Sequence, residues 1–330
     1  MTANETRVLR LGTRRSALAR TQSGHVAAAI EAAAAARGER VTVELVDVVT
    51  TGDTSTASLR TFGGVGVFVT SLRDALLAKE VDLAVHSLKD LPTAPFPGLV
   101  VAAVPQREDP RDVLVARDGL TVGELPAGSR IGTGSPRRAA QLRALGLGLE
   151  VVDVRGNVDT RLGFVASGEL DAVVLARAGL LRLGRADEAT EVLDPLVMLP
   201  APGQGALAVE CREADEDVVA AVAALDDPTT RAAVEAERTL LRVLEAGCAA
   251  PLGALADVVE GDDGEELFLR AVVASADGAV TIRRSTTGPA DDATGVGARL
   301  AHVLLEDGAA ELVAPESARP AYAAAREGDL

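Results

Sequence analysis

The feature that most constrains the fold is a regular alternation of short apolar runs with longer amphipathic runs. The opening part of the chain predicts, in order, a strand, a helix, a strand, a polar loop, a helix and a strand, at residues 8–11, 17–35, 41–48, 50–66, 68–79 and 83–86. Strands that alternate with helices favour a mostly parallel sheet covered by helices. Because the chain has 330 residues and domains usually contain ~100–200, more than one such unit is expected.

A second series of the same kind follows a charged and proline-rich segment. After a strand at 99–104, residues 105–112 (PQREDPRD) are interpreted as a crossover to a second domain. The second series is predicted as strands at 130–133, 149–154 and 171–175 with helices at 136–145 and 157–167. Residues 200–205 (PAPGQG) then lead into a strand at 206–211 that is expected to return to the first domain. Two crossovers between two α/β lobes predict a hinged pair with a cleft between them.

The last part of the chain changes pattern. A boundary at residues 226–228 precedes a predicted helix at 230–246, strands at 252–259, 265–274 and 279–286, and a helix at 293–305. Consecutive strands followed by a helix favour a small α+β domain. The predicted domains are therefore 1–105 together with 206–225, then 106–205, and last 226–330, so that the fold class is α/β with a third, smaller α+β domain.

Composition excludes several classes of function. The chain carries 33 Lys and Arg against 49 Asp and Glu, a net charge of −16, which argues against a broad nucleic-acid or anionic-membrane surface. Two cysteines and three histidines are too few for a clustered zinc site, so no metal is expected. No apolar run reaches the ~18 residues of a membrane span, and the first residues are charged. The protein is therefore expected to be cytoplasmic.

One strand end carries a predicted anion site. Ser135 suits a helix N-cap and Pro136 suits the first helical position, because its missing N–H would have no partner there. Free backbone amides, the helix dipole and two arginines, Arg137 and Arg138, favour an anion at this point. The alternative is an ordinary cap with two surface arginines.

The same arrangement occurs at two other strand ends. Arg14 and Ser16 follow the first strand, and Arg155 and Arg161 follow the strand at 149–154. Ligands of open α/β sheets bind at the carboxyl ends of the strands. Together with Arg182, these arginines favour a ligand with several carboxylates or phosphates, because the guanidinium fork matches such groups. An arginine taken alone at such a position is usually a solvated charge.

Three further residues are candidates for chemistry. Lys89 and Asp90 follow the strand at 83–86, where they form either a salt-bridged turn or a catalytic pair. Lysine occurs at only one other position, residue 79. Cys248 lies in a loop bounded by glycine and proline, which makes it the better nucleophile candidate. Cys211 lies within an apolar strand, where an inert core thiol is expected.

These segments, taken in order, resemble the hydroxymethylbilane synthase family, also called porphobilinogen deaminase. The resemblance rests on RLGTRRSALARTQ (10–22), VHSLKDLP (85–92), REDPRD (107–112), GTGSPRRAAQL (132–142), VRGNVDTRL (154–162), AGLLRLG (178–184), LPAPGQGALAVE (199–210) and EAGCAAPLG (245–253). It implies two hinged lobes like those of periplasmic binding proteins. It also implies a transferase of porphyrin and haem biosynthesis that deaminates four porphobilinogen molecules, joins them head to tail and releases hydroxymethylbilane by hydrolysis.

The resemblance also implies a cofactor and roles for individual residues. The chain would grow on a dipyrromethane primer, covalently bound through a thioether to Cys248. Asp90 would be catalytic, because it would bind pyrrole N–H groups and offset the positive charge of the deaminated substrate. The primer would be held by Lys89, Asp90, Thr133, Ser135, Arg137 and Arg138. The substrate and growing chain would be held by Arg14, Ser16, Gln22, Arg155, Arg161, Arg182 and Gln204.

The chain departs from the family pattern in the loop at 50–66. Many members have lysine at the positions of Thr61 and Val65, so Arg60 is the candidate to replace a lysine contact from a mobile cover.

A monomer is expected, because the sequence shows no heptad pattern and no long exposed apolar stripe, and the acidic composition predicts no nucleic-acid or membrane partner. The resemblance implies that the product passes to uroporphyrinogen-III synthase. A non-enzymatic polycarboxylate-binding module of the same two-lobed architecture is the alternative. Cys248 discriminates between the two, because a binding module needs no primer on a thiol.

Overall fold

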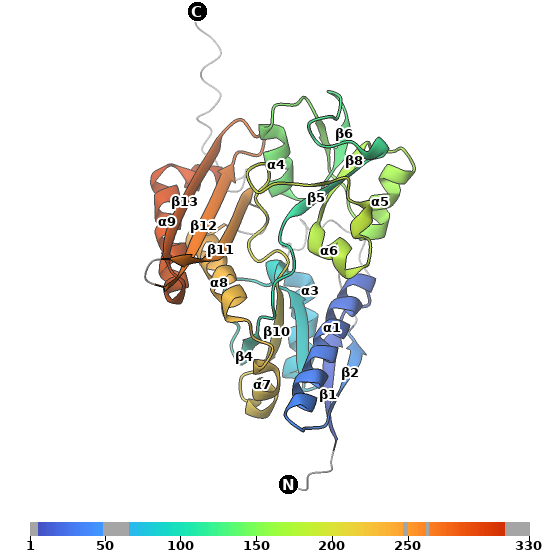
Figure 1. The fold of residues 1–330 in the computed structure, drawn as a ribbon, viewed down its shortest axis with the longest axis vertical. Helices are drawn as coiled ribbons and strands as arrows, with labels where there is room; N and C mark the ends of the chain where they lie inside the picture. The colour runs from blue at the N-terminus through green and yellow to red at the C-terminus, as the bar shows by residue number, and fades with distance from the viewer. Residues whose placement is uncertain (1–5, 49–65, 247–249, 262–263, 314–330) are drawn as a thin grey trace, which may run out of the picture.

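The computed structural model describes residues 6–48, 66–246, 250–261 and 264–313. Three separate sheets organise these residues into two α/β lobes and a third, smaller domain (Figure 1). The loop predicted at 50–66 lies outside the described residues except for its last residue, and Cys248 lies outside them as well.

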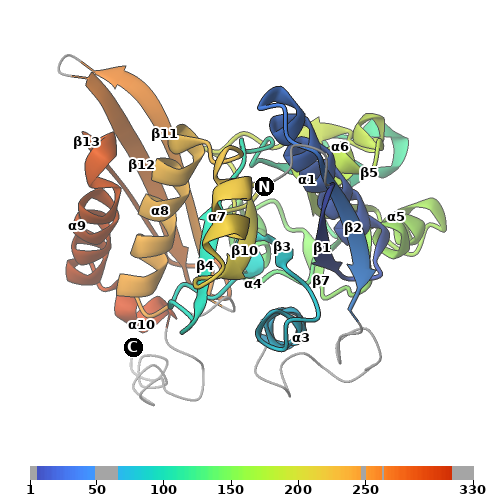
Figure 2. The same cartoon turned by 90° about the horizontal axis from the view of Figure 1, so that it is seen from below.

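The first lobe is built on a five-stranded, mostly parallel sheet. Its strands, in the order in which they lie, are β2 (Val41–Asp47), β1 (Arg7–Thr13), β3 (Leu83–Ser87), β10 (Leu207–Arg212) and β4 (Leu99–Ala103). Strand β1 pairs in parallel with β2 and β3, whereas β10 returns antiparallel between β3 and β4. Helices α1 (Ala17–Ala36) and α7 (Glu216–Ala223) cover one face of the sheet and α3 (Gly66–Leu77) covers the other (Figure 2).

The second lobe repeats this design. Its five strands lie in the order β7 (Glu150–Val152), β6 (Arg130–Gly132), β8 (Ala172–Ala176), β5 (Asp112–Ala116) and β9 (Glu191–Val192). Strand β6 is parallel to β7 and β8, and β5 is antiparallel to β8. Helix α4 (Pro136–Ala144) packs on one face through Leu142, and α5 (Val158–Ala166) and α6 (Arg177–Arg182) pack on the other.

The third domain is an antiparallel meander covered on one face by helices. Strands β11 (Leu252–Gly261), β12 (Gly264–Ala274) and β13 (Thr281–Pro289) pair in sequence order. Helices α8 (Pro228–Val243) and α9 (Ala293–Glu306) bury their apolar faces against the sheet, and α10 (Ala309–Val313) closes the described chain. Short 3-10 turns complete the elements at η1 (Leu88–Asp90), η2 (Arg117–Gly119), η3 (Ala186–Glu188) and η4 (Ala290–Asp292).

One buried carboxylate connects the two segments that cross between the lobes, near residues 105–111 and 200–206, to the third domain. Glu237 of α8, fully enclosed, accepts hydrogen bonds from Arg107 Nη1 at 2.7 Å and from the backbone amides of Gly203 at 2.6 Å and Ala256 at 2.9 Å. Arg107 belongs to the outgoing crossover, Gly203 to the returning one and Ala256 to β11. A single side chain thus holds together the point where all three parts of the protein meet.

The predicted fold class is confirmed, but several elements differ from prediction. Residues 112–116 form an internal strand, β5, between β8 and β9, although no strand was predicted there, and helices α6 and α7 were not predicted. Strand β7 is shorter than predicted, at three residues. The charged residue Asp112 suggested a solvated linker at the position where β5 begins. In the structure its side chain is buried and forms ion pairs instead.

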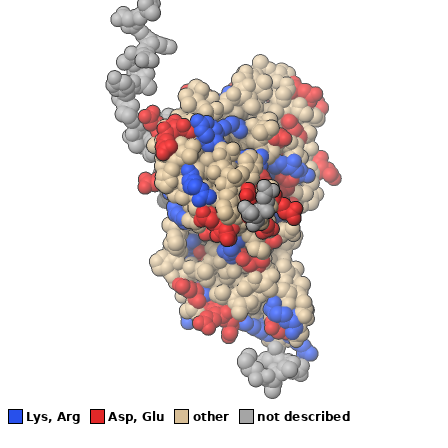
Figure 3. All heavy atoms as spheres, turned by 60° about the vertical axis from the view of Figure 1, so that its left-hand side comes forward, with Lys and Arg blue, Asp and Glu red and all other residues tan. Residues whose placement is uncertain are grey.

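The surface carries both signs of charge. On the face drawn in Figure 3, acidic and basic side chains are interspersed rather than gathered into a single basic patch. Among the described helices, none is both long and apolar enough to cross a membrane.

Candidate active site

The carboxyl ends of parallel strands from both lobes carry the predicted site residues. Lys89 and Asp90 follow β3 in the turn η1, and Arg14 and Ser16 follow β1. In the second lobe, Thr133 and Ser135 follow β6 and lead into the arginines of α4, and Arg155 follows β7. The structure therefore places these residues at the sheet edge at which open α/β sheets bind ligands.

The start of α4 has the predicted cap. The Ser135 hydroxyl accepts a hydrogen bond from the Arg138 amide at 3.5 Å, and Pro136 occupies the first helical turn. The Thr133 hydroxyl in turn accepts from the Ser135 amide at 3.2 Å. The capped turn holds the following two residues in place, but it presents Arg137 and Arg138 inward rather than to solvent: both are buried. Ser16 caps α1 in the same manner, accepting from the Ala19 amide at 3.3 Å.

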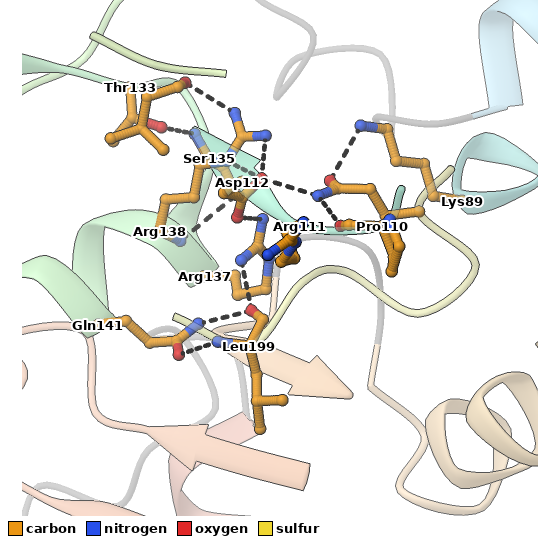
Figure 4. Close-up of polar contacts among 12 residues, drawn as sticks. Lys89, Pro110, Arg111, Asp112, Thr133, Ser135, Arg137, Arg138, Gln141 and Leu199 are labelled. Carbon is orange, nitrogen blue, oxygen red and sulfur yellow. Dashed lines mark hydrogen bonds and ion pairs between the residues drawn. The ribbon is translucent and has the colours of Figure 1, made fainter. Parts of the chain in front are cut away.

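A buried carboxylate that the sequence did not single out lies at the centre of the site. Asp112 Oδ2 lies 2.8 Å from Arg137 Nη2, and Asp112 Oδ1 lies 2.7 Å from Arg138 Nη2 (Figure 4). Gln204 Nε2 donates to the same Oδ1 at 2.7 Å. Burial opposes ionisation of Asp112, but the two arginines overcome this effect and hold the pKa of its carboxyl well below the ordinary value.

Lys89 joins the cluster from the first lobe. Its Nζ donates to Gln204 Oε1 at 3.3 Å, so one glutamine links Lys89 to Asp112 (Figure 4). The pKa of the Lys89 ammonium is lowered to about 8, chiefly by burial; the charges of Arg138 and Arg137 act in the same direction, and those of Asp90 and Asp112 oppose them. A lysine with such a pKa gains protonation when an anion binds beside it.

Asp90 is placed differently. It ends η1 with an exposed side chain, and within the described chain its carboxylate has no ion pair or hydrogen bond. The neighbouring Lys89 ammonium bonds to Gln204 instead. Of the two interpretations of the Lys89–Asp90 pair, the geometry disfavours the salt-bridged turn.

The residues fit a polycarboxylate cofactor. Arg137 uses Nη2 for Asp112 and Nη1 for the Leu199 carbonyl at 2.5 Å. Its Nε is buried and has no hydrogen-bond partner among the described residues. Because a buried donor without an acceptor is costly, this group calls for an acceptor supplied by a ligand. A carboxylate is such an acceptor.

The remaining predicted residues do not contact Asp112, and each has its own surroundings. Arg161 Nε donates to the Gly156 carbonyl at 3.0 Å, and burial lowers its pKa, with the charge of Arg138 acting in the same direction. Arg155 is exposed, and its Nη2 lies 3.8 Å from Asp153 Oδ2. Gln22 is buried in α1. Arg182 donates to the Gly205 carbonyl at 2.6 Å and lines a cavity of ≈ 410 Å³ beside the crossovers.

Sequence reasoning missed a second supporting contact. Gln141, buried one turn after Arg137, donates from Nε2 to the Leu199 carbonyl at 3.0 Å and accepts from the Leu199 amide at 2.9 Å. The amide of Ala254 donates to the next carbonyl, that of Pro200, at 2.9 Å. Helix α4 is thereby tied to β11, the strand that begins four residues after Cys248. The available signal was the polar Gln141 on the inward side of a predicted helix.

Cys211 lies in the core as expected. It is fully buried in β10, and burial raises the pKa of its thiol to about 12, so it is not a reactive thiolate.

Fold and site together define a class: two-lobed α/β proteins with an anion-binding site where the lobes join. Comparison with known families is more specific. The family model described as porphobilinogen deaminase, dipyromethane cofactor binding domain, matches residues 9–220, and the model of the porphobilinogen deaminase C-terminal domain matches 231–306. The chain belongs to the porphobilinogen deaminase family.

Curated relatives agree over nearly the whole length. The porphobilinogen deaminase 1 of Streptomyces coelicolor is 57% identical over 319 residues, covering 93% of this chain and 98% of the relative. The porphobilinogen deaminase of Nocardia farcinica is 58% identical over 310 residues, covering 92% and 88%. That of Mycobacterium bovis is 58% identical over 311 residues, covering 93% and 98%.

The solved structures that align with the chain are distant relatives in sequence. A putative methionine-binding lipoprotein of Bacillus subtilis aligns with a TM-score of 0.41 and 15% identity, covering 66% of this chain and 90% of that one. A lipoprotein of Treponema pallidum aligns with a TM-score of 0.42 and 12% identity, covering 67% and 91%.

Family membership establishes the activity. The chain is a transferase of tetrapyrrole synthesis that deaminates porphobilinogen and joins four units on a dipyrromethane cofactor to give hydroxymethylbilane. The non-enzymatic polycarboxylate-binding alternative is not favoured.

Proposed function

We propose the following division of labour among the site residues. Asp90 is catalytic, and Cys248 attaches the cofactor through a thioether. The cofactor is cradled by Lys89, Asp90, Thr133, Ser135, Arg137 and Arg138. Substrate and growing chain are held by Arg14, Ser16, Gln22, Arg155, Arg161, Arg182 and Gln204. The observation that carries the proposal is the convergence of Lys89, Arg137 and Arg138 around Asp112, with Arg137 Nε still lacking an acceptor.

The chemistry asked of these residues follows from their placement. When bound, the dipyrromethane supplies the free pyrrole carbon to which the first substrate unit is joined. Arg137 offers its unpartnered Nε to a cofactor carboxylate, the charge of Arg138 attracts these carboxylates, and Lys89 adds a third cation from the opposite lobe. Asp90, exposed at the end of η1, accepts pyrrole N–H hydrogen bonds and offsets the positive charge that develops on the substrate as ammonia leaves.

We also propose the domain boundaries, the oligomeric state and the next step for the product. The domains are 1–105 with 206–225, then 106–205, and 226–330; one sheet per domain supports this division. The chain acts as a monomer, since its exposed large apolar residues are scattered over many elements. Its linear product passes to uroporphyrinogen-III synthase. The cytoplasmic location stays a prediction from the sequence, as does the contact from Arg60.

The arginines should separate by the stage of the reaction that they serve. Replacing Arg137 or Arg138 by leucine removes a cation from the cluster and leaves cofactor carboxylates without their partner, so these variants should be purified mostly without cofactor. Replacing Arg14 or Arg161 by leucine should leave the cofactor bound and stall elongation at partial chain lengths. Intact-mass spectrometry of each variant after brief exposure to porphobilinogen gives the cofactor content and the ladder of bound units.

The matched control is Arg130→Leu, which removes an exposed arginine from the opposite end of β6. It should keep both full cofactor and normal elongation. Lysine in place of Arg137 or Arg138 should give intermediate cofactor content, because it keeps the charge but not the fork. Full cofactor and no partial chains in every arginine variant would contradict the staged roles and favour a diffuse electrostatic effect.

A further inference from the structure

The site contains a charge whose purpose is not explained by direct contact with a ligand. Asp112 is fully enclosed, so its carboxylate is out of reach of substrate. It nevertheless touches both arginines proposed to grip the cofactor, and it touches Gln204, which bonds to Lys89. An enclosed carboxylate is costly unless it is paired and hydrogen-bonded. Asp112 is paired with both arginines and its Oδ1 accepts hydrogen bonds from Arg138 and Gln204, whereas its Oδ2 has the ion pair with Arg137 and no hydrogen bond among the described residues.

The two oxygens of Asp112 orient two different guanidinium groups. Oδ1 accepts from Arg138 Nε at 3.2 Å and from Nη2 at 2.7 Å, which fixes the plane of that guanidinium. Oδ2 lies 2.8 Å from Arg137 Nη2. Carbonyl oxygens hold the outer nitrogens: Val174 accepts from Arg138 Nη1 at 2.9 Å and Leu199 accepts from Arg137 Nη1 at 2.5 Å. Neither arginine can rotate freely, and Arg137 Nε is left for a ligand.

The position of Asp112 in the chain adds a second role. It is the first residue of β5, where the outgoing crossover ends, and Gln204 lies in the returning crossover. Lys89 lies at the end of β3 in the first lobe, whereas the arginines lie on α4 in the second. The sequence of contacts Lys89, Gln204, Asp112 and Arg138 therefore crosses from one lobe to the other through both connecting segments (Figure 4).

The charges at this point do not cancel. Asp112 contributes one negative charge against the positive charges of Arg137 and Arg138, with Lys89 nearby. One carboxylate can order two guanidinium groups but can neutralise only one of them. The frame is thus held together before the cofactor arrives and still carries surplus positive charge to attract its carboxylates.

We propose that Asp112 is a positioning residue for the cofactor: its buried carboxylate sets the orientation of Arg137 and Arg138 and, through Gln204, their spacing from Lys89. The inference rests on the proposed function, because it takes Arg137 and Arg138 as the cofactor grip. Asp112 itself contacts neither cofactor nor substrate.

The test compares Asp112→Asn and Asp112→Glu with the control Asp171→Asn. Asp171 is a carboxylate of the same lobe that pairs with Arg117 at 2.7 Å, beside the start of β8. Asparagine keeps the size of Asp112 but presents a neutral amide to Arg137, whereas glutamate keeps the charge and displaces it by one methylene. Both should lower the ratio of cofactor-bound to cofactor-free protein about tenfold, in line with the loss of one charge-assisted contact, and Asp171→Asn should not.

A pH profile separates positioning from simple loss of structure. The groups that act on Lys89 are Asp90 on its own turn, Arg137 and Arg138 from α4, and Asp112 from β5. Removing the charge of Asp112 disfavours the protonated lysine, so the alkaline limb of kcat/KM, measured on the cofactor-bound fraction, should move to lower pH in Asp112→Asn. It should stay in place in Asp112→Glu and in Asp171→Asn. General destabilisation of the lobe would not produce this difference.

The outcomes are distinguishable. Normal cofactor content and an unmoved alkaline limb in Asp112→Asn would overturn the role of Asp112. If Asp112→Asn does not fold, normal cofactor content in Asp112→Glu would overturn it equally. If Arg137→Leu and Arg138→Leu also keep the cofactor, the fault lies in the proposed function; if they lose it while the Asp112 variants keep it, only the present inference fails.

Discussion

Replacing Asp90 by alanine is expected to lower kcat about 10³-fold, the scale on which a lost preorganised electrostatic contact acts. Asp90 ends the turn after β3, exposed and without an ion pair or hydrogen bond among the described residues, so its carboxylate is available to the reacting substrate. Because Asp90 supports no buried contact, the fold should persist and the cofactor should be retained through Lys89 and the arginines. Steady-state consumption of porphobilinogen and the intact mass of the variant measure the two effects separately.

The conservative variant sharpens the expectation. Asp90→Glu keeps the charge but moves it by one methylene, so it should retain part of the activity and accumulate partial chains. Asp118, an exposed aspartate of the second lobe, provides the control: Asp118→Ala should turn over normally. A near-normal kcat in Asp90→Ala would remove Asp90 from the centre of the reaction.

Replacing Glu237 by alanine is expected to lower the free energy of unfolding by about 3–5 kcal/mol, the usual cost of breaking a buried ion pair from one side. The substitution leaves Arg107 without its carboxylate, and it leaves the amides of Gly203 and Ala256 without their acceptor. The junction of both lobes with the third domain should loosen. Urea denaturation followed by circular dichroism measures the loss.

Glu235 supplies the matched control for Glu237. It lies on the same helix, exposed, with one hydrogen bond from Thr294 at 3.0 Å. Glu235→Ala should change the free energy of unfolding by no more than about 0.5 kcal/mol. Equal effects at both positions would show that the junction does not depend on the buried carboxylate.

The predictions that succeeded rest on local physics. The alternation of strand and helix defined both lobes, because apolar periodicity reflects which face of an element is buried. The cap at Ser135 was predictable, since an N-cap serine followed by proline depends on neighbours within one turn. The family motifs lie at the carboxyl ends of the predicted strands, where ligands of open α/β sheets bind.

The features that escaped prediction depend on contacts distant in sequence. Asp112 pairs with arginines more than twenty residues away in the sequence, and Arg107 pairs with Glu237, which is 130 residues away. In the sequence, Asp112 belongs to a charged, proline-rich run that is typical of a solvated linker. Glu237 lies at helical spacing from Ala233 and Leu240 on the apolar face of its helix, but its partners are distant in sequence and give no local signal. Only the fold reveals that both carboxylates are enclosed.

The measurement that tests the account most directly is the intact mass of the purified protein beside Cys248→Ser and Cys211→Ser. The central claim is that the chain builds its product on a dipyrromethane attached to Cys248. The unsubstituted protein and Cys211→Ser should each exceed the mass of the polypeptide by two linked pyrrole units, and Cys248→Ser should not, because a hydroxyl is a far weaker nucleophile than a thiol. An unmodified native protein, or an adduct lost from Cys211→Ser instead, would contradict it.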